Sequence, residues 1–261
     1  MEFFGAKFQI FTLLFARVLA VFSVSPFFGG QALSFFYRIA LAFLVSLVVT
    51  PVLPVSAELQ SLIENRYLVL ILEQVFIGFF IGLTLQVLFA AFQMAGEFFS
   101  VQMGFGISQV MDPVSQISLP LMGTINNLMA LFVFFATSSH LRIINAVVFS
   151  YEKIPYFKFN ILTDIGHQKG VSDFLIFMGS SMFLVALKLA LPIMGTLFLV
   201  SLTLGILSKA APQMNILMLG FPLKIYVGFI VMAWLSPLIV ETILAQLDIF
   251  FQHIDNIIQQ F

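Results

Sequence analysis

The sequence contains no cysteine, and histidine is scarce. The absence of cysteine excludes disulfides, thiolate metal sites, iron–sulfur clusters and cysteine nucleophiles. The three histidines, His140, His167 and His253, lie far apart in the sequence, and neither an HExxH nor a GxSxG motif is present. Nothing in the residues argues positively for a nucleophile with its base or for a metal-ligand cluster. We therefore expect a protein that is not an enzyme and that needs no metal or cofactor.

Charged residues are also rare. They make up 9% of the 261 residues, against about 25% in an ordinary soluble domain. The 11 basic and 12 acidic side chains leave a net charge of −1, so no basic field exists that would attract nucleic acid. Hydrophobic residues reach 61%, with 34 Phe and 12 Met but a single Trp. This composition is typical of a membrane protein, and nucleic-acid binding is not supported.

Long apolar runs fill most of the chain. Most of them reach the roughly 20 residues that cross a bilayer as an α-helix. The runs cover residues 8–25, 39–55, 68–92, 121–139, 174–207 and 217–244. Plausible breaks lie between them at 26–30, 51–54, 104–120, 151–173 and 209–222. The sequence therefore predicts an all-α integral membrane protein with six hydrophobic segments. Arg17 interrupts the first run and no cleavage pattern follows, so we interpret this run as a retained helix rather than a signal peptide.

The fifth run is too long for one simple span. Residues 174–207 would make roughly 50 Å of helix, against about 30 Å of hydrocarbon. Lys188 lies in its middle and Pro192 follows one turn later. The helix is therefore expected to tilt, kink, break or leave the bilayer, or to be buried in protein.

The distribution of charges does not fit a chain laid conventionally back and forth across a membrane. Four basic residues between Arg142 and Lys169 would place that segment in the cytoplasm. Continuing the count puts Lys209 and Lys224 outside and the acidic C-terminal part inside, which is the reverse of the usual rule. Either the long fifth run crosses twice or the chain is not a simple serpentine.

Several polar residues stand inside the apolar runs. A charged one would cost about 2.5–3.5 kcal/mol at the centre of an isolated span. They are expected to face protein or water, as partners within the chain, as contacts with other subunits or as the lining of a wet conduit. The residues are Arg17, Glu73, Gln74, Gln86, Glu97 and Lys188. Gly78 and Gly82 form a small-xxx-small pair that would let another helix backbone approach closely.

A segment rich in glycine and proline lies at the centre of the chain. From Ala95 to Pro120 it reads AGEFFSVQMGFGISQVMDPVSQISLP. Its glycines loosen the backbone and its prolines stop helices, so we expect a non-helical loop. Such a loop survives within a membrane assembly only where protein or a water-filled cavity satisfies its backbone groups. It either lines a passage with soft methionine and phenylalanine side chains or packs the core as a re-entrant loop. The side chains are those of Met94, Met103, Phe105, Met111 and Met122.

Two motifs in the sequence resemble a known family. The first is AGEF followed by VQMGFG, MDP and LP. The second, LGILSKAAPQMNILMLGFPLKIYVG, starts at Leu204 and includes Ala211, Pro212, Gln213, Asn215, Gly220, Phe221, Pro222 and Lys224. Both are similar to the FliR/SctT family, an export-gate subunit of bacterial flagellar and type III secretion systems. The length and hydropathy of the chain also fit.

The resemblance implies an architecture and a set of partners. Residues 174–261 resemble the two-helix partner FliQ/SctS, and residues 1–173 would correspond to the larger FliP/SctP subunit. One copy would complete a helical ring of FliP-like and FliQ-like subunits and would meet an FlhB-like switch subunit. Membrane lipid and unfolded secreted proteins would be its other contacts. The expected location is the bacterial inner membrane at the flagellar basal body.

The resemblance also implies functional residues. Residues 104–119 would plug the protein-conducting pore, with the plug set Met103, Gly104, Phe105, Gly106, Val110, Met111, Asp112 and Pro113. The subunit interface would include Glu97, Lys209, Gln213, Asn215 and Lys224. The polar residues near the turn between the last two helices have an alternative interpretation as ordinary solvated loop residues.

Two other functions are compatible with the residues. A virulence-associated type III secretion system would use a similar subunit. A small-molecule transporter could place its site at helices interrupted near Gly104 and Pro192, although matching interruptions in two halves of the chain are not evident.

Overall fold

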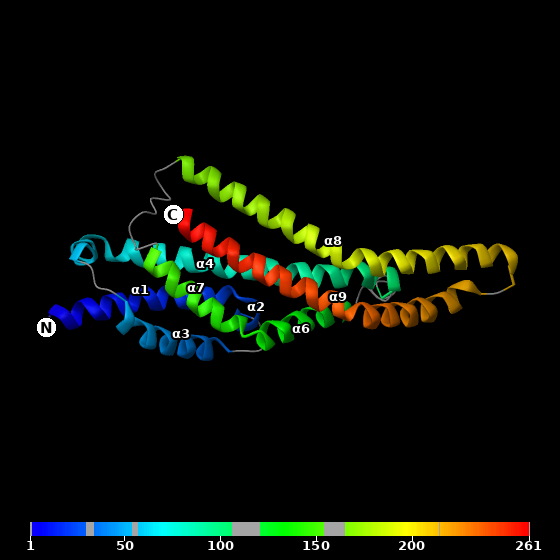
Figure 1. Cartoon of the computed structure of the whole chain (residues 1–261), viewed down its shortest axis with the longest axis horizontal. Helices are drawn as coiled ribbons and strands as arrows, with labels where there is room; N and C mark the ends of the chain where they lie inside the picture. Colours follow the sequence, from blue (N-terminus) through cyan, green and yellow to red (C-terminus); the bar gives the residue numbers. More distant parts are fainter. Residues whose placement is uncertain are drawn as a thin grey trace, which may run out of the picture. The chain divides into compact units, whose positions relative to one another are not determined.

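The computed structural model describes residues 2–29, 34–53, 57–105, 121–153, 165–213 and 215–260. Every regular element in these ranges is helical, which confirms the predicted all-α class (Figure 1). The elements are α1 (Glu2–Val24), α2 (Pro26–Gly29), α3 (Phe35–Val49), η1 (Thr50–Val52), α4 (Ala57–Met103), α6 (Leu121–Ala136), α7 (Ser139–Lys153), α8 (Ile165–Ala210) and α9 (Ile216–Gln260).

The helices form two compact units. Unit 1 comprises Met1–Val87, Thr137–Ile176 and Leu247–Phe261, and unit 2 comprises Leu88–Ala136 and Phe177–Gln246. The division of the chain after residue 173 was predicted from the resemblance of its two parts to two partner subunits. The two compact units do not test that resemblance, so the division stays a prediction.

Five helices in the described ranges are long and apolar enough to cross a membrane, and α6 and α7 would add a sixth if they count as one span. This agrees with the six hydrophobic segments of the sequence. The chain is a membrane protein by the length and composition of these helices.

In unit 1, α4 packs closely on α1. A Cβ on Gly78 would collide with the backbone oxygen of Arg17, and one on Gly82 would lie 3.0 Å from the oxygen of Val21. The two glycines therefore let the helix backbones touch, which confirms the close approach predicted from their spacing. Ala20 and Val24 complete the contact on α1.

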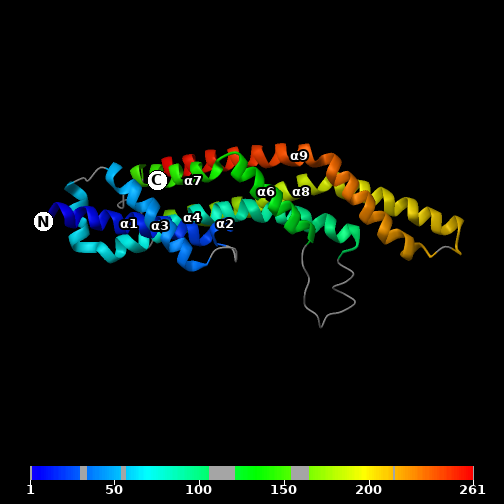
Figure 2. The ribbon, with the colours of Figure 1, turned by 90° about the horizontal axis from the view of Figure 1, so that it is seen from below.

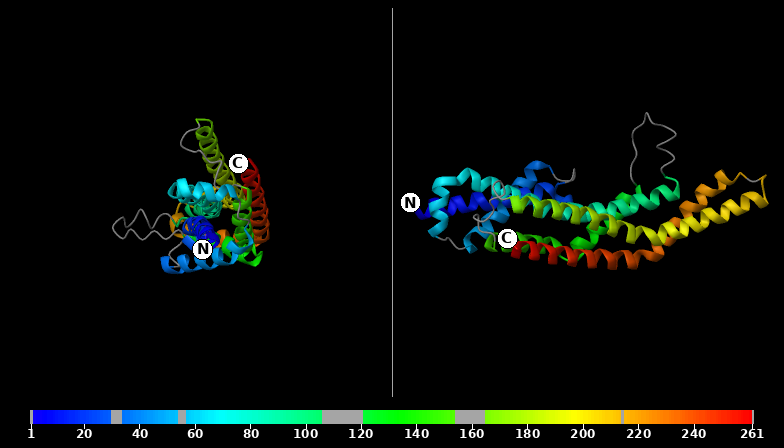
Figure 3. Two further views of the ribbon diagram at one scale, coloured as in Figure 1. Left: turned by 90° about the vertical axis from the view of Figure 1, so that its left-hand side faces the viewer. Right: turned by 90° about the horizontal axis from the view of Figure 1, so that it is seen from above.

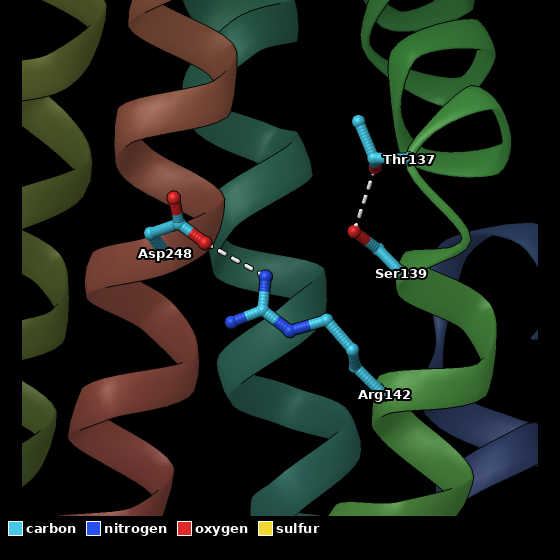
Figure 4. Close-up of polar contacts among 4 residues, drawn as sticks. All are labelled: Thr137, Ser139, Arg142 and Asp248. Atoms are coloured by element: carbon cyan, nitrogen blue, oxygen red, sulfur yellow. Dashed lines mark hydrogen bonds and ion pairs between the residues drawn. The ribbon is translucent and has the colours of Figure 1, made fainter.

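Unit 1 also includes the C-terminal end of α9. Arg142 on α7 donates a hydrogen bond from Nη1 to Oδ1 of Asp248 on α9 at 2.7 Å (Figure 4). The same guanidinium lies 4.1 Å from the ring centre of Phe251. Thr137 and Ser139 share a hydrogen bond of 2.8 Å at the start of α7. The two contacts of Arg142 hold the part of α9 around Asp248 and Phe251 against α7.

In unit 2, the final part of α4 packs on α6. A Cβ on Gly96 would lie 2.5 Å from backbone atoms of Gly123, so the two backbones are in direct contact. The unit also contains a helical hairpin in which α8 and α9 run antiparallel from a short connection after Ala210. Figures 1 and 2 show the two helices side by side at this connection, in yellow and orange. The right-hand view of Figure 3 shows them from the side opposite to that of Figure 2.

Two predicted breaks are shorter than the sequence suggested, since residues 165–173 begin α8 and Pro222 lies inside α9. The segment from Ala95 was also expected to be non-helical, yet residues 95–103 continue α4. Gly96 is tolerated in a helix because its missing side chain admits Gly123. Membrane helices also accept internal proline, because neighbouring groups satisfy the freed carbonyl. The same applies to Pro192, through which α8 continues, and Figure 1 shows α8 bending along its length.

Candidate functional site

The central segment leaves α4 through a defined helix end. Gly104 has φ +96°, a left-handed conformation that favours glycine. Its N–H donates to the oxygen of Val101 at 3.1 Å, and the N–H of Phe105 donates to the oxygen of Ser100 at 3.2 Å. This pair of bonds is the Schellman motif, which ends a helix with glycine in the position just beyond it. The MGFG sequence therefore ends α4 directly before Gly104, the first residue of the segment predicted to be a plug, and the plug itself stays a prediction.

The same helix end is seated on α9. A Cβ on Gly104 would lie 2.6 Å from Cδ1 of Phe221, and a Cβ on Gly228 would lie 2.7 Å from Cε of Met103. Met103 is 1% exposed. We call Met103, Gly104, Phe221 and Gly228 the loop seat. It joins the two motifs of the sequence, MGFG and GFPLKIYVG, by direct contact.

Sequence reasoning did not foresee this contact. Phe221 was noted only as a motif residue, and Gly228 was given no role, although it closes the quoted motif. The signal that could have pointed to the seat is the spacing of Phe221 and Gly228, which places both on one face of a helix after two turns. Such spacing does not identify the partner.

Glu97 belongs to α4 and lies where this helix contacts α6 in unit 2. Its Oε1 would be 2.7 Å from a Cβ on Gly123, and its side chain is half-buried. Close by, Nδ2 of buried Asn126 donates a long 3.4 Å bond to the oxygen of Phe92. Oδ1 of Asn126 has no hydrogen-bond partner among the described residues. Glu97 and Asn126 are thus polar side chains at the contact between α4 and α6, and Glu97 is the charged one of the two.

Lys209, Gln213 and Asn215 lie at the connection between α8 and α9, as the sequence predicted, and all three are exposed. Oδ1 of Asn215 accepts the N–H of Met218 at 3.3 Å, which caps the start of α9. Lys224 is half-buried and lies further along α9. The structure therefore gives Asn215 a local role, and a role for these four residues in subunit contacts stays a prediction.

The remaining residues of the predicted plug lie outside the described part of the chain. They are Gly106, Val110, Met111, Asp112 and Pro113.

The polar residues of the apolar runs have different environments. Arg17 is 0% exposed, and its Nε donates to Oε1 of Gln74 while Nη1 donates to Oγ of Ser150, both at 2.8 Å. Its guanidinium also lies 5.0 Å from the ring centre of Tyr151. For Arg17 and Gln74 this confirms the interpretation as partners within the chain.

Three other polar residues have no such partners in the described part of the chain. Gln86 and Lys188 are exposed, and Glu73 is half-buried with its Oε2 lacking a hydrogen-bond partner among the described residues. In the same part of the chain, no group of three or more Asp, Glu or His side chains is placed to hold a metal ion.

Comparison with known proteins identifies the family. Residues 8–249 match the family described as "Bacterial export proteins, family 1". The flagellar biosynthetic protein FliR of Bacillus subtilis is 31% identical, over 86% of this chain and 85% of the relative. FliR of Escherichia coli is 33% identical, over 85% and 82%. FliR of Buchnera aphidicola from Acyrthosiphon pisum is also 33% identical, over 91% and 90%.

The matched region contains the loop seat, the buried Arg17 cluster and the α8–α9 hairpin. The resemblance drawn from the two motifs thus extends over nearly the whole sequence, and the chain belongs to the FliR family of bacterial export proteins.

Proposed function

We propose that this chain is a structural and gating subunit of the channel through which the flagellar type III secretion apparatus exports unfolded proteins across the bacterial inner membrane. Membership of the export family and the flagellar names of its relatives support this function. The long apolar helices support a place in the membrane. We assign the chain no covalent chemistry, in keeping with the lack of cysteine and of catalytic motifs.

The proposed gate is the segment 104–119, with Met103, Gly104, Phe105, Gly106, Val110, Met111, Asp112 and Pro113 as its working residues. The observation that carries this proposal is the loop seat. A segment that closes a pore must leave from a fixed point, and Gly104 is held by its own backbone bonds and by Phe221. Buried Met103 fastens the preceding turn to α9 at Gly228.

The proposed partners are FliP-like and FliQ-like subunits of the export gate and an FlhB-like switch subunit. Their contacts would include Glu97, Lys209, Gln213, Asn215 and Lys224. Much of the apolar surface supports such an assembly, since α8 and α9 expose many large side chains in the described residues, among them Leu202, Ile206, Met218 and Trp234. A surface of this kind needs cover from other helices or from lipid.

Deletion of residues 106–115 tests the gate. The assembled complex carrying the deletion should conduct small ions across a membrane, whereas the unaltered complex should not. The measurement is ion conductance of the purified complex in a planar bilayer, with subunit recovery as the check on assembly. Background conductance in a fully assembled deletion complex would refute the plug.

Phe221→Ala sharpens the test, because it loosens the seat and leaves the loop intact. We expect a conductance between those of the unaltered and deletion complexes, with assembly preserved. Phe229→Ala is the matched control, since Phe229 is on the same helix but 42% exposed. Equal conductance of the two variants would show that the seat does not position the gate.

A further inference from the structure

Helix α8 exposes a regular row of side chains within unit 2. Six of its exposed positions are separated alternately by four and three residues, which is the heptad spacing of a helix that packs against another helix. Other exposed side chains of α8, among them Phe183, Leu199 and Ile206, flank this row. We call the six residues of the row the α8 seam: Leu184, Lys188, Leu191, Gly195, Phe198 and Leu202. The same spacing continues to Gly205, which is also exposed. A row that keeps a 3.5-residue period fits a partner helix crossing at about 20°.

Two glycines of α8 lie in this row and contact no other helix among the described residues. A Cβ on Gly195 or Gly205 would meet nothing within 4 Å, whereas Gly78 and Gly96 are pressed against other helices. Glycine costs about 1 kcal/mol relative to alanine within a helix, so its presence needs a reason. In membrane helices the reason is usually the close approach of a second backbone.

Lys188 gives the seam a charge. Its side chain is exposed and makes no ion pair with any residue in the described ranges. The candidate span runs over Leu175–Ala210, and a hydrocarbon stretch of about 20 residues placed at most positions along it would include Lys188. An ammonium facing lipid there would cost about 2.5–3.5 kcal/mol. A carboxylate from a neighbouring helix would remove most of this cost.

The second helix of the hairpin carries the opposite charge at a similar depth. Glu241 is exposed and likewise makes no ion pair with the described residues. Lys188 lies 22 residues before the end of α8 at Ala210, and Glu241 lies 25 residues after the start of α9 at Ile216. The two levels therefore differ by about 5 Å along an antiparallel hairpin. A neighbouring hairpin of similar construction would offer a carboxylate at the depth of Lys188.

We infer that the α8 seam binds an apolar α-helix of a neighbouring membrane subunit, which carries an aspartate or glutamate opposite Lys188 and bulky side chains opposite Gly195 and Gly205. The identification of that neighbour as another export-gate subunit rests on the proposed function. The seam itself rests on the spacing, the open glycines and the unpaired charge.

Charge exchange tests the partner's chemistry in the co-expressed, purified complex. Lys188→Glu should lower recovery of the neighbouring subunit by about tenfold or more, because two carboxylates would face each other. Lys188→Arg should retain recovery. Replacing the partner's carboxylate by lysine should restore it in the Lys188→Glu complex. Lys188→Met introduces no new charge and should give an intermediate loss in recovery of the neighbouring subunit. It is the control for a folding defect caused by the charge reversal in Lys188→Glu.

Glycine variants test the close approach. Gly195→Leu and Gly205→Leu should reduce recovery of the neighbour. Gly179→Leu is the matched control, because Gly179 is on α8 with equally open space but lies off the seam. Thermal unfolding of each purified variant verifies that the chain itself is folded. Equal recovery for all three variants would overturn the seam.

Photo-crosslinking distinguishes a partner helix from lipid at the α8 seam. A benzoylphenylalanine at Leu191 should crosslink to a helix that carries an acidic residue, while one at Leu199, exposed but off the seam, should do so less. Crosslinks from Leu191 to lipid alone would refute the proposal. A seam partner outside the export apparatus would uphold the seam and contradict the proposed function. A deletion complex that fails to leak would contradict the gate and leave the seam standing.

Discussion

The two units of this protein treat polar groups in opposite ways. Unit 1 buries a guanidinium completely and surrounds it with Gln74, Ser150 and Tyr151. Unit 2 is held by backbone contacts at glycine, as at Gly96 and Gly123, and leaves charges such as Lys188 on its exposed surface.

This difference separates a charge that the chain itself stabilises from charges for which the described residues offer no partner. A buried charge with its hydrogen bonds satisfied contributes to the fold of one chain, because removing any member leaves the others unpaired. An exposed charge on an apolar helix is not stabilised by its own chain and needs water, the membrane interface or a partner subunit. Unit 1 therefore has a self-sufficient centre, and unit 2 presents the surface through which we expect assembly.

Loss of the buried guanidinium should have the largest effect. Arg17→Met leaves Oε1 of Gln74 and Oγ of Ser150 without their donor, so we expect a loss of about 3 kcal/mol or more in the free energy of unfolding. Thermal unfolding of the purified protein and its level in membranes are the measurements. Arg17→Lys should be intermediate, because it keeps the charge without the planar fork.

Lys209→Met provides the control for this prediction, since Lys209 is exposed at the end of α8. An Arg17→Met protein as stable as the control would mean that unit 1 does not depend on its polar centre, and the contrast with unit 2 would fail.

A methyl group in the glycine contact of unit 2 should have a smaller effect. In Gly96→Ala the new Cβ would lie 2.5 Å from the backbone of Gly123, so α4 and α6 must separate at a cost of about 1–3 kcal/mol. Gly179→Ala should be neutral or slightly stabilising, because its Cβ meets nothing and alanine favours helix. Gly96→Ala should lower the unfolding temperature, whereas Gly179→Ala should leave it unchanged or raise it slightly. A similar decrease in both variants would remove the packing explanation.

The exposed ion pair of unit 1 should matter least. The side chains of Arg142 and Asp248 are 46% and 62% exposed, so water and salt screen their attraction. A double-mutant cycle with Arg142→Ala and Asp248→Ala should give a coupling free energy of about 0.2–1 kcal/mol that declines with added salt. A coupling comparable to the effect of Arg17→Met would show that the charged contact between α7 and α9 is shielded by something that covers it.

The sequence predicted most helices, but it extended two breaks too far and assigned residues 95–103 to a non-helical segment. The apolar runs identified α1, α3, α4, α6, α8 and α9, because about 20 consecutive apolar residues have few other stable states. The glycine and proline cues at 95–103 and at Pro222 were over-interpreted. Whether Gly96 breaks a helix or admits another depends on Gly123, which lies on α6. No local pattern contains that information.

Part of the candidate site was predictable, because it depends on residues close together in the sequence. Gly104 marks the end of α4 because a left-handed helix terminus favours glycine, a preference that acts within one turn. The contact of Gly104 with Phe221 and of Met103 with Gly228 was not predictable, since it joins residues more than a hundred positions apart.

The sequence by itself determined that this protein is a bundle of long apolar helices with few charges, and its motifs indicated the export family. Composition and local sequence act over short distances, so they specify which segments form helices. Only the tertiary structure decided which polar residues pair inside the chain. Arg17 has partners on two other helices and Lys188 has none among the residues that the structure describes, although both stand in similar apolar runs. The difference arises from which helix surfaces meet, and packing between distant segments decides that.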